Sequence, residues 1–131
     1  MNAVDIVALS SAILLLNVLL LAINVSLARG REHVPMGGTG SPAFLRAQRA
    51  HGNSAEHTPV LVLLLMALAT AGAPDLVLAI AGTASVAARL SHGFGLLRGG
   101  GRFSVVGTYL TYIVGVLMAL AIIAVIVLRP R

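Results

Sequence analysis

Apolar residues form four long blocks along the chain, and short polar segments separate the blocks. Residues 6–28 and residues 103–128 contain no charged side chain. As α-helices, both blocks would be about 35 Å long or longer, which is enough to cross a hydrocarbon core about 30 Å thick. We therefore predict membrane-spanning helices over about residues 5–28 and residues 103–128.

The second apolar block is short for a span, but a signal for a helix start lies well before it. Ser41 followed by Pro42 is typical of a helix N-cap with proline at the first helical position. We therefore expect one long helix over residues 42–72, with its first part at the membrane surface.

The third block is predicted to span the membrane over residues 75–97, between a Gly72–Pro74 turn and a run of three glycines that begins at Gly99. Arg89 and His92 interrupt its apolar pattern. Arg89 lies about two turns from the end of the span, so its side chain either snorkels to the membrane surface or faces into the protein.

Composition limits the class of protein. Hydrophobic residues make up 58% of the 131 residues and charged residues only 10%, which excludes a water-soluble enzyme of this size. The net charge of +5 does not indicate nucleic-acid binding, because the arginines cluster between the apolar blocks, as membrane topology requires. We predict one all-α domain over residues 1–131, a four-transmembrane-helix bundle with the lipid bilayer as a partner and no nucleic acid.

The chain contains no cysteine, and its four histidines show no metal-ligand spacing. Neither a disulfide nor a metal site is therefore expected.

Arginines also predict the orientation of the chain. The segments around the first and third helix connections hold Arg29, Arg31, Arg46, Arg49, Arg98 and Arg102. The opposite side has only Arg129 and Arg131. By the positive-inside rule both long loops face the cytoplasm and both termini lie outside. Phe44, Phe94 and Phe103 fall near the cytoplasmic boundary, where we expect an aromatic belt.

Small and polar residues predict which faces of the spans turn inward. Close packing in lipid favours small residues at helix contacts. Two stripes of four-residue spacing are candidates, namely Gly107, Thr111, Gly115 and Ala119 in the fourth span and Ala79, Thr83 and Ala87 in the third. The alanine-rich composition would also produce such spacings by chance. Ser10, Asn17 and Asn24 share one face of the first span, and we expect them to form hydrogen bonds inside the bundle.

The most informative polar segment lies at the entrance to the second span. Arg49, Asn53 and Glu56 share one helix face, and His57 stands beside them. Charged groups entering a membrane face protein or a water-filled cavity, so this face is predicted to point into the bundle or a subunit interface. An Arg49–Glu56 ion pair that only fixes helix register is the alternative.

Up to seven arginines converge on the predicted cytoplasmic side, with only Glu32 and Glu56 to balance them. This excess predicts a site for an anion. A small ligand with two carboxylates and one amine would match it, since arginine binds carboxylates bidentately and Glu56 is available for an ammonium group. Anionic lipid headgroups are the alternative ligand.

The segment RAQRAHGNSAEHTP, residues 46–59, resembles the signature of the MAPEG superfamily, the membrane-associated proteins in eicosanoid and glutathione metabolism. The core of the match is Arg-x3-Asn-x2-Glu-x2-Pro, formed by Arg49, Asn53, Glu56 and Pro59. The segments at residues 88–95 and residues 102–112 also resemble the third and fourth spans of the family. The chain is most similar to bacterial-type members that resemble microsomal glutathione transferases.

The resemblance implies a homotrimer with glutathione as co-substrate, bound between neighbouring subunits on the cytoplasmic side. The positions that match glutathione-anchoring residues are Arg29 or Arg31, Arg49, Asn53 and Glu56. Arg102 matches the catalytic arginine that stabilises the glutathione thiolate. His57 and His92 stand where glutathione-using members tend to carry tyrosines, and we include both in the predicted cofactor site. The bacterial type implies a multi-pass protein of the inner membrane, with detoxification as its role.

The leading function hypothesis is a membrane transferase whose glutathione thiolate attacks apolar electrophiles or lipid hydroperoxides that enter from the bilayer. The alternative is a non-catalytic protein of the same fold that binds a lipid or another small anion. A small four-span transporter is disfavoured, because such proteins carry a mid-span carboxylate and the span centres here contain none.

Overall fold

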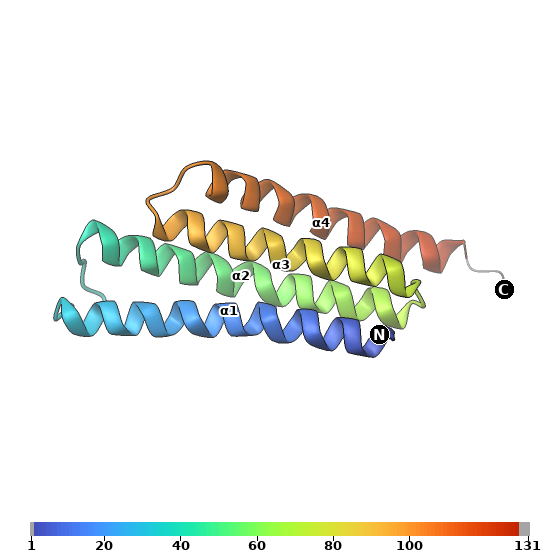
Figure 1. Ribbon diagram of the computed structural model, residues 1–131, viewed down its shortest axis with the longest axis horizontal. Helices are drawn as coiled ribbons and strands as arrows, with labels where there is room; N and C mark the ends of the chain where they lie inside the picture. Colours follow the sequence, from blue (N-terminus) through green and yellow to red (C-terminus); the bar gives the residue numbers. More distant parts are fainter. Residues whose placement is uncertain (1, 129–131) are drawn as a thin grey trace.

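Each apolar block of the sequence forms one helix, and the four helices lie side by side as an antiparallel bundle (Figure 1). The computed structural model describes residues 2–128. Its helices are α1 (Ala3–Arg31), α2 (Pro42–Thr70), α3 (Asp75–Leu97) and α4 (Arg102–Val127), close to the predicted ranges. Arg129 and Arg131 lie outside the described residues. The long α1–α2 connection and the α3–α4 connection lie at one end of the bundle, which we call the loop end (left in Figure 1); the second of these is as short as the α2–α3 turn, not the long loop that was predicted.

Side-chain caps define where α1 and α2 begin. The Oδ1 atom of Asn2 accepts a hydrogen bond from the main-chain nitrogen of Asp5 at 2.9 Å, and the Asp5 carboxylate accepts one from the Asn2 nitrogen. The Ser41 hydroxyl accepts a hydrogen bond from the main-chain nitrogen of Phe44 at 3.2 Å, as the predicted N-cap requires. Pro42 directly follows this cap at the start of α2.

Three of the four helices are long and apolar enough to cross a membrane, namely α1, α3 and α4. The remaining helix, α2, is long enough but not apolar enough to cross a membrane, because its first half carries the polar segment around Arg49 and Glu56. It nevertheless packs along both α1 and α3 in the middle of the bundle. The chain is therefore an integral membrane protein with a four-helix bundle, in which α2 is the least lipid-like element.

The apolar core lies in the half of the bundle opposite the loop end. It is formed by buried side chains from all four helices, among them Leu14, Leu61, Leu65, Leu78 and Met118. The outward faces of α1 and α4 are also apolar, with exposed leucine, isoleucine and valine along their whole length. Lipid tails solvate such faces, so the outward sides of these two helices need no polar residues.

Glycines allow two close helix approaches. A Cβ atom on Gly107 of α4 would lie 2.5 Å from the main-chain nitrogen of His92 in α3, so only glycine permits this contact. Gly82 of α3 packs directly against Ser10 of α1. These contacts confirm the inward face predicted for α4 at Gly107 and for α1 at Ser10.

The stripe predicted on the third span is wrong within the protomer. Thr83 and Ala87 are exposed and Ala79 is only partly buried, whereas the buried small residues of α3 are Gly82, Ser85, Ala88, Gly93 and Gly95. The real contact face is therefore rotated away from the predicted one. An alanine-rich helix offers several small-residue stripes, and their spacing alone does not select one.

Of the three phenylalanines predicted for an aromatic belt, two have the exposed side chains that a belt requires. Phe94 and Phe103 are exposed and pack edge to face, with ring centroids 5.6 Å apart. Phe44, in contrast, is 0% exposed and packs with Ala28 and Val34 beneath the α1–α2 connection. It is a core residue of the loop end, because α1 and the connection cover the first turn of α2.

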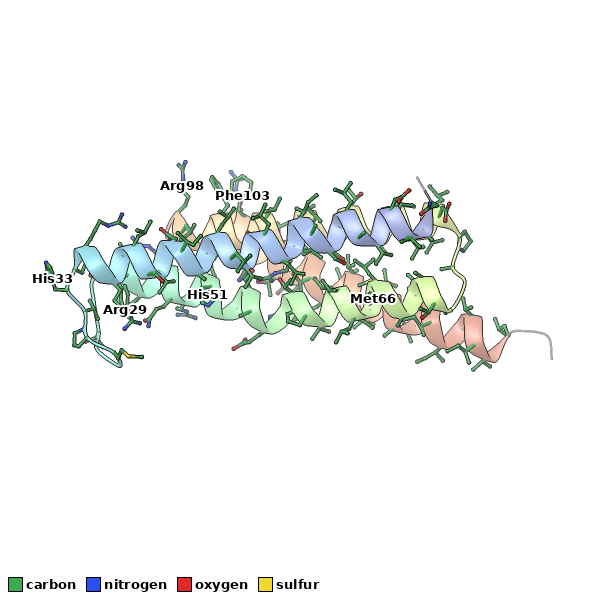
Figure 2. The ribbon with its side chains drawn as sticks, turned by 90° about the horizontal axis from the view of Figure 1, so that it is seen from below. Arg29, His33, His51, Met66, Arg98 and Phe103 are labelled. Atoms are coloured by element: carbon green, nitrogen blue, oxygen red, sulfur yellow. The ribbon has the colours of Figure 1, made fainter. Side chains whose placement is uncertain are left out.

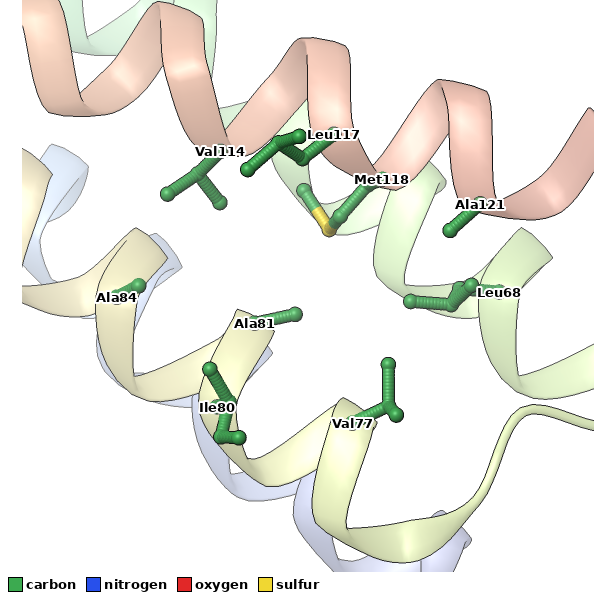
Figure 3. A pocket seen from close by; sticks show the side chains of 9 residues that line it. All are labelled: Leu68, Val77, Ile80, Ala81, Ala84, Val114, Leu117, Met118 and Ala121. Carbon is green, nitrogen blue, oxygen red and sulfur yellow. The ribbon is translucent and has the colours of Figure 1, made fainter.

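The groove between α3 and α4 is purely apolar. It has Leu68 of α2 at its base and a volume of about 240 Å³ (Figure 3). Small side chains such as Ala81, Ala84 and Ala121 leave this space open. Its lining offers no polar group, so the chemistry must be sought nearer the loop end.

Candidate functional site

A buried arginine connects α2, α3 and α4. Arg89 is 1% exposed, and its Nη2 atom donates a hydrogen bond of 2.8 Å to Oδ1 of Asn53 in α2. Longer contacts of 3.4 Å and 3.3 Å join the guanidinium to the hydroxyls of Ser54 in α2 and Thr111 in α4. The side chain of Asn17 in α1 donates to the same Ser54 hydroxyl at 3.1 Å, so the network reaches all four helices.

This geometry excludes snorkelling for Arg89, since its guanidinium points into the bundle. Its partners are neutral oxygens, and no carboxylate contacts it within residues 2–128. Its Nε atom is buried and has no hydrogen-bond partner in the same part of the chain. A buried cation with only neutral partners leaves a positive potential at the centre of the loop-end half.

Arg89 also determines which way the Asn53 amide faces. A guanidinium has only donors, so the Asn53 atom 2.8 Å from Nη2 must be the carbonyl oxygen. The Nδ2 group of Asn53 is therefore directed away from Arg89, with two donors available. A ligand that binds there must offer acceptor oxygens, such as those of a carboxylate or a peptide carbonyl.

Main-chain carbonyl oxygens place the ring hydrogen of His57 and of His92 on Nδ1. Nδ1 of His57 lies 3.0 Å from the carbonyl oxygen of Asn53, and Nδ1 of His92 lies 3.0 Å from the carbonyl oxygen of Ser104. A carbonyl only accepts, so each Nδ1 carries the hydrogen. When the rings are neutral, each presents an Nε2 lone pair, and that of His92 is buried without a partner among the described residues.

The hydrogen bonds of His57 and His92 give these side chains a different role from that of the tyrosines they replace. A tyrosine hydroxyl at these positions would donate to a ligand, but the donors of both histidines are used by the backbone. The neutral rings are therefore acceptors toward a ligand. They suit a thiol or ammonium group rather than a second anion.

A small recess joins these groups into one site. It is lined by Asn53 and His57 of α2, Arg89 of α3, and Thr108, Thr111 and Tyr112 of α4. The His57 and Tyr112 rings face each other with centroids 5.6 Å apart. An apolar groove of about 400 Å³ between α2 and α4 begins at the same two rings. The recess itself is too narrow to admit a water molecule in the protomer, so the open space nearest these polar groups is the apolar groove at His57 and Tyr112.

Arg49 and Glu56 lie on α2 one turn to either side of Asn53, and both are exposed. They form no hydrogen bond or ion pair with residues 2–128, so the alternative of a register-fixing ion pair is wrong. Two opposite charges on one surface of α2 are therefore available to a partner outside the protomer.

The remaining predicted residues lie around the loop end without joining the recess. The Arg29 guanidinium donates to the carbonyl oxygen of Pro35 at 3.2 Å and lies 5.5 Å from the centre of the Phe44 ring. Arg31 is exposed near the end of α1. Arg102 is exposed at the first position of α4, and no contact brings it to Asn53 within the described protomer.

Glu32 is held mainly by Ser41, which occupies both of its oxygens, and the charge of Arg31 is a smaller contribution. The main-chain nitrogen of Ser41 donates to Oε2 at 2.7 Å, and its hydroxyl donates to Oε1 at 2.6 Å. These hydrogen bonds hold the pKa of Glu32 below its usual value. The carboxylate therefore stays ionised and fastens the end of α1 to the start of α2.

Sequence reasoning missed the central role of Arg89 and its hydroxyl partners. The available signal was the coincidence of a charge inside the third span with Ser54 and Thr111 inside the neighbouring helices. Lone hydroxyl residues in membrane helices are common, so this signal becomes clear only when the helices are placed together. No group of three metal-ligating side chains occurs within residues 2–128.

Comparison with known proteins gives one finding. The sequence model described as the MAPEG family matches residues 7–124, which include all four helices. No curated protein matches the chain.

Proposed function

The chain belongs to the MAPEG family, and from this membership and the geometry of the loop end we propose that it is a glutathione-binding membrane transferase. The observation that carries the proposal is the pair of exposed, unpaired charges, Arg49 and Glu56, on either side of the oriented Asn53 amide. Glutathione carries two carboxylates, one ammonium group and peptide carbonyls. Its charges complement this surface of α2.

We assign Arg49 to a glutathione carboxylate, Glu56 to the ammonium group and the Nδ2 group of Asn53 to an acceptor oxygen. Arginine suits a carboxylate because its planar fork donates two parallel hydrogen bonds. The exposed position of Arg49 and Glu56 supports a site between subunits, since a neighbouring protomer would cover charges that one protomer leaves open. We therefore include a homotrimer in the proposal.

The proposed chemistry begins with loss of the thiol proton. Nε2 of neutral His57 is an acceptor at the edge of the recess, and it is the candidate to take this proton. Arg102 from the start of α4 would stabilise the thiolate, as the family resemblance implies, because a nearby cation favours the charged form. The thiolate sulfur then bonds to an electrophilic carbon, and the displaced group or the new anion takes up a proton.

Apolar substrates fit the path that leads to this point. The groove between α2 and α4 is lined by apolar side chains such as Val60 and Val116, and it meets the recess at His57 and Tyr112. A hydrophobic electrophile dissolved in the bilayer would therefore reach the sulfur without crossing water. Lipid hydroperoxides are a second substrate class for the same thiolate.

Glutathione binding to detergent-purified protein, measured by calorimetry, tests the proposal. Arg49→Gln and Glu56→Gln should each weaken binding at least tenfold, and Arg98→Gln on another part of the loop end is the matched control. Arg102→Gln should preserve most of the affinity but raise the pH at which thiolate absorbance of bound glutathione appears. Equal binding by wild type and Arg49→Gln in folded protein would refute the site.

A non-catalytic family member is the second candidate, and the Arg89 network supports it. Both Nη atoms of Arg89 already bond to the protein's own Asn53, Ser54 and Thr111, so the network has a structural role without any ligand. This candidate predicts a folded protein that neither binds glutathione nor conjugates it to model electrophiles. Glu56 is exposed, so its removal is a clean test and should not unfold either version of the protein.

A further inference from the structure

A second groove opens on the face of the bundle formed by α1 and α3. Its volume is about 600 Å³, and its walls are mainly apolar, with Leu20 and Leu21 from α1 and Leu90, Phe94 and Leu97 from α3. Asn17 and Asn24 mark its length along α1. Seven residues of helix separate these two asparagines, so the groove is roughly 10 Å long. These dimensions and walls suit a hydrocarbon chain.

The groove continues into a polar cavity at the loop end. This cavity has a volume of about 290 Å³ and shares Asn24 and Leu97 with the apolar groove. Arg31 and Glu32 contribute to its walls. One continuous space therefore changes from apolar to charged as it approaches the predicted membrane surface.

A second arginine stands at the junction. The guanidinium carbon of Arg98 lies 4.9 Å from the centre of the Phe94 ring, which packs edge to face on Phe103. Arg98 and Phe103 project to the same side of the bundle (Figure 2). Phe94 and Phe103 also line the groove, so the aromatic pair places the Arg98 charge beside its opening.

The charges at this opening are predominantly positive and unpaired. Arg31 and Arg98 are both exposed, and neither forms an ion pair with the part of the chain that is described. Glu32 is the nearby acid, but Ser41 occupies both of its oxygens. The opening therefore offers an anion two exposed guanidinium groups, Arg98, which rests on the Phe94 ring, and Arg31, whose charge also acts on Glu32.

We propose that the groove between α1 and α3 binds an anionic phospholipid, with its phosphate between Arg31 and Arg98 and one acyl chain along Leu20, Leu21 and Leu90. Charge complementarity selects this occupant, because anionic headgroups collect at arginine-rich membrane surfaces. The apolar continuation accounts for the tail, which a free phosphate ion lacks. This site lies apart from the Arg49–Asn53–Glu56 surface and does not depend on glutathione binding, although Arg31 is also one of the two α1 positions that the family resemblance assigns to glutathione.

The chain contains no tryptophan, so one introduced tryptophan reports on one place. Phe103→Trp places an indole at the groove and preserves an aromatic partner for Phe94. The protein is reconstituted in vesicles with phosphatidylglycerol or phosphatidylcholine that carries bromine near the headgroup end of the acyl chain, and fluorescence quenching is measured. Tyr109→Trp, on the exposed face of α4 away from the groove, is the matched reporter.

We expect brominated phosphatidylglycerol to quench the Phe103→Trp protein several-fold more strongly than brominated phosphatidylcholine, and to quench the Tyr109→Trp protein equally with both lipids. Adding Arg31→Gln and Arg98→Gln should bring the ratio at Phe103→Trp close to one, whereas adding Arg49→Gln should leave it unchanged. Equal quenching by both lipids in the first protein would overturn the proposal. Absence of quenching by either lipid would also overturn it, and would identify the groove as a contact between copies of this chain. Loss of the preference with excess glycerol phosphate would show that the headgroup alone binds.

Discussion

Replacing Asn53 by leucine removes the acceptor that lies 2.8 Å from Nη2 of Arg89. The remaining acceptors, on Ser54 and Thr111, lie at 3.4 Å and 3.3 Å, too far to compensate fully. Leucine has the same branched arrangement of side-chain heavy atoms as asparagine and a higher helix propensity, so the main loss is the hydrogen bond. The variant therefore leaves a buried cation with poor solvation.

The expected cost follows from the charge of the donor. A hydrogen bond to a charged group contributes about 1.5–3 kcal/mol, whereas neutral side-chain bonds between membrane helices average about 0.6 kcal/mol. We expect Asn53→Leu to lower the free energy of unfolding by about 2 kcal/mol. Asn17→Leu, which removes the neutral bond to Ser54, should cost about 0.6 kcal/mol and is the matched control.

A double-mutant cycle separates this bond from other effects of the substitution. Arg89→Met removes the cation and replaces it with an apolar side chain of similar length, a change that is often neutral for buried charges. In that background Asn53→Leu should cost almost nothing, which gives a coupling energy of about 2 kcal/mol. Unfolding by sodium dodecyl sulfate in mixed micelles, followed by far-ultraviolet circular dichroism at several protein concentrations, measures all four proteins. The reasoning is refuted if Asn53→Leu costs the same with and without Arg89.

Substitutions at Glu56, Ser41 and Gly107 test three further features of the structure. Glu56→Gln should change the free energy of unfolding by less than about 0.5 kcal/mol while weakening glutathione binding, which unfolding and calorimetry on the same preparation will show. Because the folded pKa of Glu32 is below its unfolded value of 4.5, the ionised carboxylate stabilises the fold fully above pH 4.5, and this stabilisation is lost as the pH falls through the folded pKa. Ser41→Ala should raise the folded pKa of Glu32 in a carboxyl-carbon NMR titration. An unchanged pKa in this variant would contradict the role of Ser41. Gly107→Leu should lower the free energy of unfolding by about 1–3 kcal/mol or more, because the new side chain meets the His92 backbone, and a wild-type unfolding midpoint would show that α3 and α4 do not approach closely.

Helix boundaries were predictable because apolar blocks and cap residues define them locally. Ser41 ends the α1–α2 connection through its own hydroxyl, and the glycines after Leu97 end α3, so neighbouring residues carry the information. The three successive positive φ angles from Gly99 to Gly101 are likewise a local property of glycine. None of these features depends on how the helices pack.

Which face of each helix turns inward was only partly predictable, because the helices are surrounded by lipid rather than water. In water, an amphipathic stripe marks the buried face, but lipid leaves the outer faces of α1 and α4 as apolar as the core. Only small and polar residues then mark the inward side. Ser10 and Gly107 did so correctly, whereas Thr83 misled because α3 has several small-residue stripes.

The candidate site shows the same division. The α2 surface of Arg49, Asn53 and Glu56 was visible from helical spacing alone, because its members belong to one helix. The inward direction of Arg89 depends on oxygens from α2 and α4, and no local pattern encodes it. The donor direction of the histidines was missed for a similar reason, since the carbonyl that orients His92 belongs to another helix.

The Arg89 network has a consequence for how the chain enters the membrane during synthesis. Among the helices long and apolar enough to span, α3 is the least apolar, and an arginine near the centre of an inserting helix costs about 2.5–3.5 kcal/mol. Asn53 and Ser54 are translated before Arg89 and form its acceptors. Neither α2 nor α3 is well suited to enter lipid alone, and a short turn at Gly72 joins them. We therefore expect the two helices to enter the bilayer as one hairpin with their polar groups already paired.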